Sequence, residues 1–425
     1  YAKKAEEVSV SPDNYGYVKG SYTNNGDYDD FDEGESYLEL SNTEEDMLDT
    51  VCSQFDNVIV VVNANNAMEL DWVDKYEQIG AVIFAPGAGA TGFEALGEII
   101  NGSVNPSGKT VDTFVKDLTE TPYYNNMGLN AYTNVEDLKE QIAANDPAYE
   151  GSMGFVNYAE GIYVGYKFYE TAYAEAEAGN MDFDYDKVVQ YPFGYGLSYT
   201  SFSQKIVDSS ETDEGIKLTV EVENTGDVAG KDVVEVYYNP PYTNGGIEKS
   251  AANLIDFGKT GVLNSGEKET LEFTINKEDM ASYDYKNEGC YVLDEGDYEL
   301  SIRSDAHTIL DTVEYNVPET IVYDEDNARE SDQQTATNQF DFAEGDGVVY
   351  LSRENGFENY DEATAAPIDF TMDEDRKANY QNITNYDIDS MNDNSEEMPT
   401  TGADNKIKLG ALRGKDYDDE MWDSL

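Results

Sequence analysis

The chain has 425 residues, of which 39% are hydrophobic and 12% aromatic, enough apolar material for two or three packed domains. It carries 26 Lys and Arg against 89 Asp and Glu, a formal net charge of -63. A surface this acidic repels phosphate groups, so the composition argues against binding to nucleic acid or to anionic membranes. The sequence contains no apolar run of about 18 residues, so no membrane-spanning segment is expected.

The cysteine and histidine content argues against several kinds of site. Cys52 and Cys290 lie far apart in sequence and predict neither a disulfide framework nor a zinc site. A single histidine, His307, argues against a Ser-His-Asp triad and a multi-histidine metal centre. The acidic runs lack the spacing of an EF-hand and are interpreted as solvated surface, with another kind of cation site left open. We therefore predict no cofactor and no metal.

Residues 1–36 are rich in Gly, Asn, Asp and Tyr, which predicts a polar N-terminal loop. The chain begins with Tyr1 rather than Met and shows no signal-peptide pattern, so we expect a truncated or processed start. The first helix is expected to begin at Asn42 or Thr43, because either can cap a helix and two acids follow in the first turn. Its apolar stripe is predicted to consist of Met47, Leu48, Val51 and Phe55.

Two apolar runs follow, at 58–62 and 81–85. The first is continuous and β-branched, which is typical of a strand buried on both faces of a parallel sheet. A second helix is expected at 93–100. Helix, strand, strand and helix in this order indicate an α/β domain with a parallel sheet, and we place it at residues 37–200.

The apolar pattern changes to strict alternation after residue 200. Residues 216–222, 271–275 and 298–302 alternate apolar and polar side chains, with glycine-rich turns between the runs. Such alternation is typical of an antiparallel β-sandwich, which we place at 201–318. The predicted fold class is therefore α/β, with a parallel-sheet α/β sandwich domain followed by an antiparallel β-sandwich.

The chain beyond residue 318 is polar and acidic again. Residues 319–409 are predicted to be an acidic connector with little capacity to form a core, apart from one isolated strand at 347–351. Residues 410–425 are expected to begin another helix-bearing unit that stops in mid-pattern, so truncation is expected at this end as well.

Two glycine motifs suggest phosphate binding. Residues 87–92 match G-x-G-x-x-G, and Asp112 lies at about the distance of a ribose-binding acid. However, Pro86 separates the strand from the glycines and no complete mononucleotide-binding half is visible, so a loop passing close to its neighbours is the simpler interpretation. Residues 108–110 resemble the end of a P-loop, but Ser103 stands where that loop requires glycine. NAD and ATP are therefore not expected to bind.

Tyrosine is abundant, with 34 residues. Tyrosine rings stack on sugars and their hydroxyls bind sugar hydroxyls, so a cluster suits carbohydrate, although packing between domains is the commoner use. The cluster around the domain junction consists of Tyr158, Tyr163, Tyr166, Tyr169, Tyr191, Tyr195 and Tyr199. Residues 191–200 combine aromatic residues with Pro192 and two glycines, and we expect them to be the junction itself, with Phe193 largely buried between the domains.

Several motifs occur in an order that resembles one family. They are Val58-Ile59-Val60-Val61-Val62-Asn63-Ala64-Asn65-Asn66-Ala67-Met68-Glu69-Leu70, Pro86-Gly87 with Gly92, Gly102-Ser103-Val104-Asn105-Pro106-Ser107-Gly108-Lys109, Glu160-Gly161-Ile162-Tyr163-Val164-Gly165-Tyr166-Lys167-Phe168-Tyr169, Tyr191-Pro192-Phe193-Gly194-Tyr195-Gly196-Leu197-Ser198-Tyr199-Thr200, Asn224-Thr225-Gly226-Asp227-Val228-Ala229-Gly230 and Gly296-Asp297-Tyr298. Together they resemble glycoside hydrolase family 3, the β-glucosidase family. The resemblance covers residues 37–318 well, and 338–367 and 410–425 more loosely.

The resemblance implies three parts: a barrel carrying an aspartate nucleophile, an α/β sandwich domain carrying a glutamate acid/base, and a fibronectin type III-like domain. The order here resembles permuted members of the family, with residues 410–425 as the start of a missing barrel. The family's acid/base lies in a Gly-Glu-Gly-like loop, and its nearest match is Glu35 in Gly34-Glu35-Ser36. The glycine loop departs from the family pattern, with Ala88 where Gln or Glu is usual.

The resemblance therefore implies the non-barrel part of a retaining β-glycosidase acting on terminal β-glucosyl residues, inactive by itself. Its implied partners are a β-linked glucoside or oligosaccharide and the barrel domain of the same protein. The alternatives are a carbohydrate-binding or interaction module without catalysis, and nucleotide binding at 87–92. Strong acidity slightly favours a bacterial cell-surface or extracellular location.

Overall fold

The computed structural model describes residues 29–383, apart from 90, 127–129, 146–152, 332, 337 and 339–347, together with 406 and 412. Residues up to Arg376 form one compact unit and Lys377–Leu425 a second, and the architecture below is that of the first. The loop predicted before residue 29 and the unit predicted at 410–425, except Leu412, lie outside the described residues. Within the described ranges no helix is both long and apolar enough to cross a membrane.

The first helix, α1 (Asn42–Cys52), is capped by Ser41 rather than by Asn42 or Thr43. Ser41 Oγ accepts a hydrogen bond from Glu44 N, and the Glu44 carboxylate accepts one from Ser41 N, which completes a capping box. The buried face also differs from the predicted stripe. Leu48 and Cys52 face the core, whereas Met47 is 56% exposed.

The first two strands form a parallel pair, as predicted. β1 (Val58–Val62) pairs with β2 (Ile79–Phe84), and α2 (Phe93–Ile100) follows at the predicted residues. The expectation that β1 is buried on both faces was wrong, because Ile59 is 48% exposed and only Val62 is fully buried. α2 has no buried residue. The faces of this sheet are therefore less buried than the apolar composition of its strands predicts.

Up to residue 191, the described residues of this region form nine further elements. They are η1 (Asp71–Lys75), β3 (Phe114–Val115), η2 (Leu118–Glu120), β4 (Asn130–Ala131), α3 (Glu136–Asn145), β5 (Gly154–Phe155), α4 (Tyr166–Glu177), α5 (Tyr185–Val188) and β6 (Val189–Tyr191). β3 pairs with β6 and β4 with β5, both antiparallel. Apolar side chains from β1, α1 and α4 meet in one core, which includes Trp72, Phe114 and Tyr163.

Part of the segment predicted to be an acidic connector belongs to this core. Leu351, Phe357 and Ala363 are buried in it, and the Phe357 ring lies 4.9 Å from that of Tyr163. Residues 348–351 are not a strand, although Leu351 N donates to Ala159 O at 2.7 Å. The prediction failed here because a few apolar residues in an acidic segment suffice when their partners lie elsewhere in the chain. α6 (Tyr360–Ala363) and α7 (Glu374–Ile383) follow.

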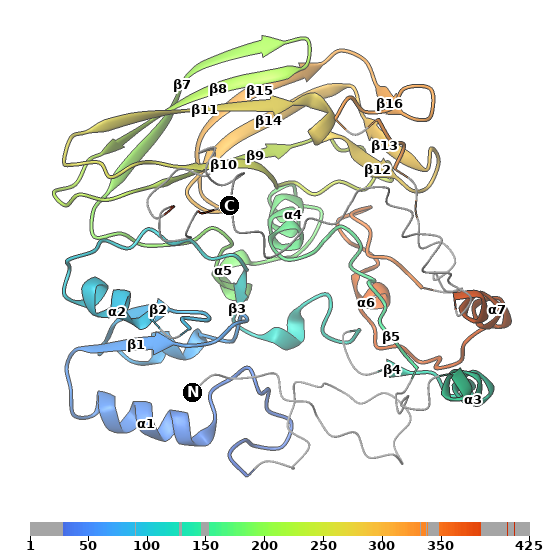
Figure 1. Cartoon of the computed structure of the whole chain (residues 1–425), viewed down its shortest axis with the longest axis horizontal. Coiled ribbons are helices and arrows are strands. Elements are labelled where there is room, and N and C mark those ends of the chain that lie inside the picture. The colour runs from blue at the N-terminus through green and yellow to red at the C-terminus, as the bar shows by residue number, and fades with distance from the viewer. Residues whose placement is uncertain are drawn as a thin grey trace. The chain divides into compact units, whose positions relative to one another are not determined.

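The antiparallel β-sandwich is present as predicted (Figure 1). One sheet has the order β10-β9-β14-β15, a second β11-β8-β7, and a small third sheet β12-β13-β16. The strands are β7 (Phe202–Thr212), β8 (Gly215–Asn224), β9 (Val233–Asn239), β10 (Asn253–Lys259), β11 (Lys268–Asn276), β12 (Ser282–Asp284), β13 (Cys290–Leu293), β14 (Gly296–Arg303), β15 (Ile309–Val317) and β16 (Ile321–Tyr323), with η3 (Lys277–Met280) after β11.

β8 and β9 differ in how their two faces are covered. The apolar residues of β8 point into the sandwich core, and its polar residues point out. In β9, Val234 and Val236 enter the same core, but Tyr237 on the opposite face is also buried. Tyr237 joins a small cluster with Tyr166 and Phe193 of the α/β region. The outer face of the four-stranded sheet is therefore the surface that packs on the α/β region.

Candidate functional site

Residues 105–110 and residues 191–200 form hydrogen bonds with one another at the junction. Thr110 N donates to Tyr195 O at 2.8 Å, Thr110 O accepts from Gly194 N at 2.9 Å, and Thr110 Oγ1 donates to Pro192 O at 2.6 Å. A Cβ on Gly196 would collide with the carbonyl oxygen of Gly108, so this close approach requires glycine. These motifs thus have a structural explanation.

The same motifs also reach the β-sandwich. Asn105 Oδ1 accepts from Tyr199 N at 2.8 Å, and its Nδ2 donates to Ala229 O at 3.1 Å. Lys109 Nζ donates to Ser304 O at 2.8 Å. Lys109, which resembled a P-loop residue, therefore binds a carbonyl oxygen of the sandwich. The glycines of the other motif, Gly87, Gly89 and Gly92, lie in the loop between β2 and α2.

Residues between β6 and β7 contain no helix or strand, in keeping with the predicted junction. The Phe193 ring lies 4.8 Å from that of Tyr166, and Phe193 O accepts from Ala306 N at 2.8 Å. Phe193 is half-buried rather than largely buried, and its sandwich neighbours come from residues 237–306 rather than from those just after 200. The prediction missed this because the covering face belongs to β9, which is remote in sequence.

Glu248 is a second centre of contacts at the junction. Its Oε2 accepts from Tyr163 Oη at 2.7 Å and from Arg353 N at 3.0 Å. Its Oε1 accepts from Ser352 Oγ at 2.6 Å and from Lys286 Nζ at 3.3 Å. Glu248 is buried, so these donors replace its lost hydration and make it a structural acceptor that joins three parts of the chain.

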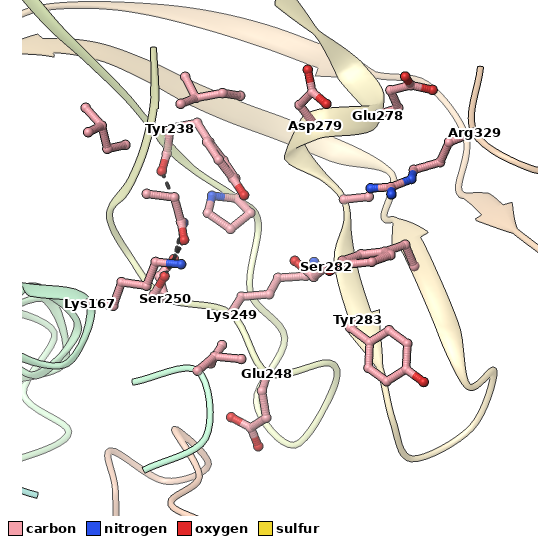
Figure 2. A pocket seen from close by; sticks show the side chains of 17 residues that line it. Lys167, Tyr238, Glu248, Lys249, Ser250, Glu278, Asp279, Ser282, Tyr283 and Arg329 are labelled. Carbon is pink, nitrogen blue, oxygen red and sulfur yellow. Dashed lines mark hydrogen bonds between the residues drawn. The ribbon is translucent and has the colours of Figure 1, made fainter. Parts of the chain in front are cut away.

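A cavity of about 430 Å³ lies beside this centre (Figure 2). Its walls come from the start of α4, from β9, β10 and η3, and from the neighbourhood of β12 and β13. The charged residues in the lining are Lys167, Lys249, Arg329, Glu248, Glu278 and Asp279. A cavity of this size at the boundary of two structural regions is where small molecules usually bind.

The carboxylates of this cavity do not form a hydrolytic pair. Both oxygens of Glu248 accept from the donors described above, and those of Glu278 accept from Glu330 N at 2.8 Å and Ser331 N at 3.0 Å. Asp279 is exposed. A general acid needs a proton held near a bond that it can cleave, whereas Glu248 and Glu278 are occupied as structural acceptors.

Two buried carboxyls elsewhere have raised pKa values. Burial raises the pKa of Glu69 to about 7, against a hydrogen bond from Leu118 N at 2.7 Å. Burial likewise raises the pKa of Glu235 to about 7, against a hydrogen bond from Tyr237 Oη at 2.8 Å. Neither lines the cavity. Sequence patterns gave no signal for these shifts, because burial of a glutamate depends on the tertiary packing around it.

Glu35, the residue nearest to the expected acid/base loop, lies in a turn before α1. Its Oε2 accepts from Asp32 N at 2.7 Å, three residues away. Asp112, the candidate ribose ligand, accepts from the adjacent Thr113 N at 2.8 Å. The structure brings neither residue to the cavity of Figure 2. Among the described residues, no group of three or more His, Cys, Asp or Glu could hold a metal ion.

The junction tyrosines divide into two groups. Tyr163, Tyr166 and Tyr169 pack in the molecule, and Tyr166 Oη accepts from Leu254 N at 3.0 Å. Tyr158 is 72% exposed and Tyr199 47%. Packing therefore accounts for Tyr163 and Tyr169 within the α/β core and for Tyr166 between the regions, while the Tyr158 ring is exposed.

Comparison with protein families identifies two domains. The glycosyl hydrolase family 3 C-terminal domain matches residues 4–166, and the fibronectin type III-like domain matches residues 232–306. The first match begins before the predicted boundary at 37 and takes in most of the segment interpreted as a loop. The resemblance that the motifs carried is thereby confirmed.

Several β-glucosidases are similar to the chain over about two thirds of its length. Beta-glucosidase A of Butyrivibrio fibrisolvens is 34% identical over 286 residues, 63% of this chain and 30% of the relative. A β-glucosidase of Ruminococcus albus is 30% identical over 68% of this chain and 27% of the relative. The chain thus spans about 30% of the length of such curated relatives.

Solved structures agree with these similarities. A β-glucosidase from Paenibacillus barengoltzii superposes with a TM-score of 0.57 at 30% identity, covering 69% of this chain and 29% of that one. β-Glucosidase 3B from Thermotoga neapolitana, solved with α-D-glucose, superposes with a TM-score of 0.54 at 29% identity, covering 67% of this chain and 35% of that one.

Proposed function

We propose that this chain, which carries a glycosyl hydrolase family 3 C-terminal domain and a fibronectin type III-like domain, is the part of a β-glucosidase that supports a separate catalytic barrel. The observation that carries the proposal is its similarity to β-glucosidases over 63% of its own length and about 30% of theirs. The substrate class follows from those relatives: terminal β-glucosyl residues of glucosides or short oligosaccharides.

Hydrolysis with retention needs two carboxyl groups about 5 Å apart on either side of the scissile bond, one ionised and one protonated. The carboxyl groups that line the cavity of Figure 2 are those of Glu248 and Glu278, which are structural hydrogen-bond acceptors, and that of Asp279, which is exposed. In the proposed enzyme the nucleophile belongs to the barrel, and the α/β domain helps to close the site beside it. The junction contacts of Asn105, Lys109 and Glu248 then hold the two domains of this chain as one support.

The test is an assay of aryl β-glucoside hydrolysis with the purified chain and with the same chain joined to a barrel domain. We expect no turnover above the buffer rate for the chain alone and clear turnover for the joined protein. NMR of the first-formed anomer of the product then checks retention. Circular dichroism shows that the inactive chain is folded.

Glu35 gives the assay a residue-level control. Turnover by the chain alone that is lost in Glu35→Gln and kept in Glu33→Gln, a change in the same loop, would overturn the proposal and identify Glu35 as the acid/base. Turnover kept in both variants would overturn it without involving Glu35. Binding of β-glucosides by an inactive joined protein would instead support the carbohydrate-binding alternative.

A further inference from the structure

Lys167 lines the cavity of Figure 2 and has no charged partner among the residues that the structure describes. It is the second residue of α4 and is half-buried. Among the described residues none accepts a hydrogen bond from its ammonium group or forms an ion pair with it, and the first turn of α4 holds no acid. Burial alone lowers the pKa of Lys167. This isolation is unusual in a chain with a net charge of -63.

The other charged groups of the cavity are already partnered. Lys249 Nζ lies 2.6 Å from Asp294 Oδ2, and the Arg329 guanidinium lies 4.9 Å from the Tyr291 ring centre. Glu248 and Glu278 accept the hydrogen bonds described above. In Figure 2, Lys167 enters from the α4 side and Arg329, Glu278 and Asp279 lie across the view from it. Asp279 Oδ2 accepts from Asn276 Nδ2 at 3.3 Å, so among the charged groups of this lining the Lys167 ammonium alone has no hydrogen bond or ion pair with a described residue.

We propose that this cavity binds a small hydroxylated monocarboxylate, a sugar acid, whose carboxylate pairs with Lys167. An ammonium group shielded from water gains most from a negatively charged partner that it can contact directly. The lining also contains hydroxyl and amide groups with tyrosine rings and aliphatic side chains, a mixture that suits a hydroxylated ring. These residues are Ser250, Asn253, Ser282, Tyr238, Tyr283, Leu254 and Ile255.

Charge and size narrow the class of ligand. Glu278 and Asp279 at the same cavity, together with the net charge of -63, disfavour phosphate and other polyanions. A neutral sugar would remove the remaining water from the half-buried ammonium group without supplying a charged partner, which costs free energy. The volume of about 430 Å³ is at the small end of ligand cavities and accommodates a single sugar ring.

The test is a titration of the full chain with glucuronate, followed by isothermal calorimetry and by NMR line broadening of the ligand. Glucose and inorganic phosphate are the comparison ligands. We expect saturable binding of glucuronate, at least tenfold weaker binding of both comparison ligands, and at least tenfold loss in Lys167→Met. Lys205→Met removes the same charge from an exposed position on β7 and is expected to bind as the unchanged chain does.

Three results would overturn the proposal: no saturable binding of glucuronate, equal binding of glucose, or equal loss in Lys205→Met. Tighter binding of phosphate would also overturn it, because the cavity would then be a general anion site. If Lys167→Met proves unfolded by circular dichroism, Lys167→Gln keeps a polar side chain and removes the charge in its place. The inference is independent of the proposed function, since it requires neither a barrel nor hydrolysis.

Discussion

The sandwich and the α/β region bury the apolar residues of their strands to different extents. In the sandwich, β8 and β14 place Leu218, Val220 and Leu300 in a core where each is fully buried. In the α/β region, β1 has one exposed isoleucine and a single fully buried valine, and α2 has no buried residue. Two parallel strands and an uncovered helix are less than an α/β sheet normally needs to be stable alone.

The difference indicates where the stability of the chain resides. Apolar surface stabilises a fold in proportion to the area removed from water, and the inward faces of β8, β9 and β14 are almost wholly buried in the sandwich core. The α/β region depends on contacts from outside its sheet, through the Glu248 centre, the Phe193 cluster and residues 348–364. We therefore expect the sandwich to be the last part to unfold.

The largest expected effect tests this comparison directly. Leu300→Ala should lower the free energy of unfolding of the sandwich by about 2–5 kcal/mol, because the side chain is fully buried. Ile100→Ala at the end of α2, where the side chain is 49% exposed, should change stability by less than about 0.5 kcal/mol. Urea unfolding with hydrogen exchange resolved by region measures both. Equal effects would contradict the comparison.

A smaller effect is expected at the junction. Phe193→Ala should cost about 2 kcal/mol, less than for a fully buried phenylalanine because the ring is half-buried. It should also separate the unfolding of the α/β region from that of the sandwich, since the ring contacts both. Leu197→Ala, in the same segment and 72% exposed, is the matched control. A single transition at unchanged stability would show that Phe193 does not join the regions.

The smallest expected effect depends on pH. With a pKa of about 7 when folded and about 4.5 when unfolded, Glu69 keeps its proton in the folded state where the unfolded chain has lost it. Its contribution to stability is therefore largest below about pH 4.5 and falls as the pH rises to about 7. Glu69→Gln should remove this fall and stabilise the chain at pH 8 by on the order of 1 kcal/mol, allowing for solvent screening.

Two further variants assign this pH effect to a region. Glu235→Gln should act in the same direction on the sandwich, since its pKa is also about 7. Glu77→Gln, at an exposed position, should show no such effect. Thermal unfolding of each variant at pH 5 and pH 8 is the measurement. A Glu69→Gln protein that is less stable at pH 8 than the unchanged chain would contradict this prediction. It would show that the Glu69 carboxylate is ionised in the folded state and stabilises it.

The sandwich could be predicted from sequence because its core faces follow a period of two. Ile216, Leu218, Val220 and Val222 alternate with polar residues, and all four are buried. Strand β9 departs from the period, because Tyr237 is buried by α4 and the junction, contacts that no local pattern encodes. The parallel pairing of β1 and β2 was predicted correctly, while their burial was not, since it depends on neighbours.

The candidate site was mostly beyond sequence reasoning. Lys167, Glu248 and Arg329 come from three segments that only the fold brings to one cavity. Glu248 and Arg353 belong to no recognised motif, and the ion pair of Arg353 with Glu175, at 2.6 Å, joins residues 178 positions apart. The motifs included residues of the junction such as Asn105, but they gave no indication of its contacts with the β-sandwich.

Residues 348–364 have a consequence for synthesis of the chain. They complete the α/β core, yet they leave the ribosome only after the whole sandwich has been translated. Domains usually fold in the order in which they emerge, but here the α/β region emerges before the sandwich and still waits for its last core residues. Closing a contact such as that between Tyr163 and Phe357 also carries the entropy of a long intervening loop unless that loop is already folded. We therefore expect the sandwich to fold first on the ribosome. Once folded, it shortens the effective loop between the α/β region and residues 348–364, and so brings this late segment close to the core that it completes.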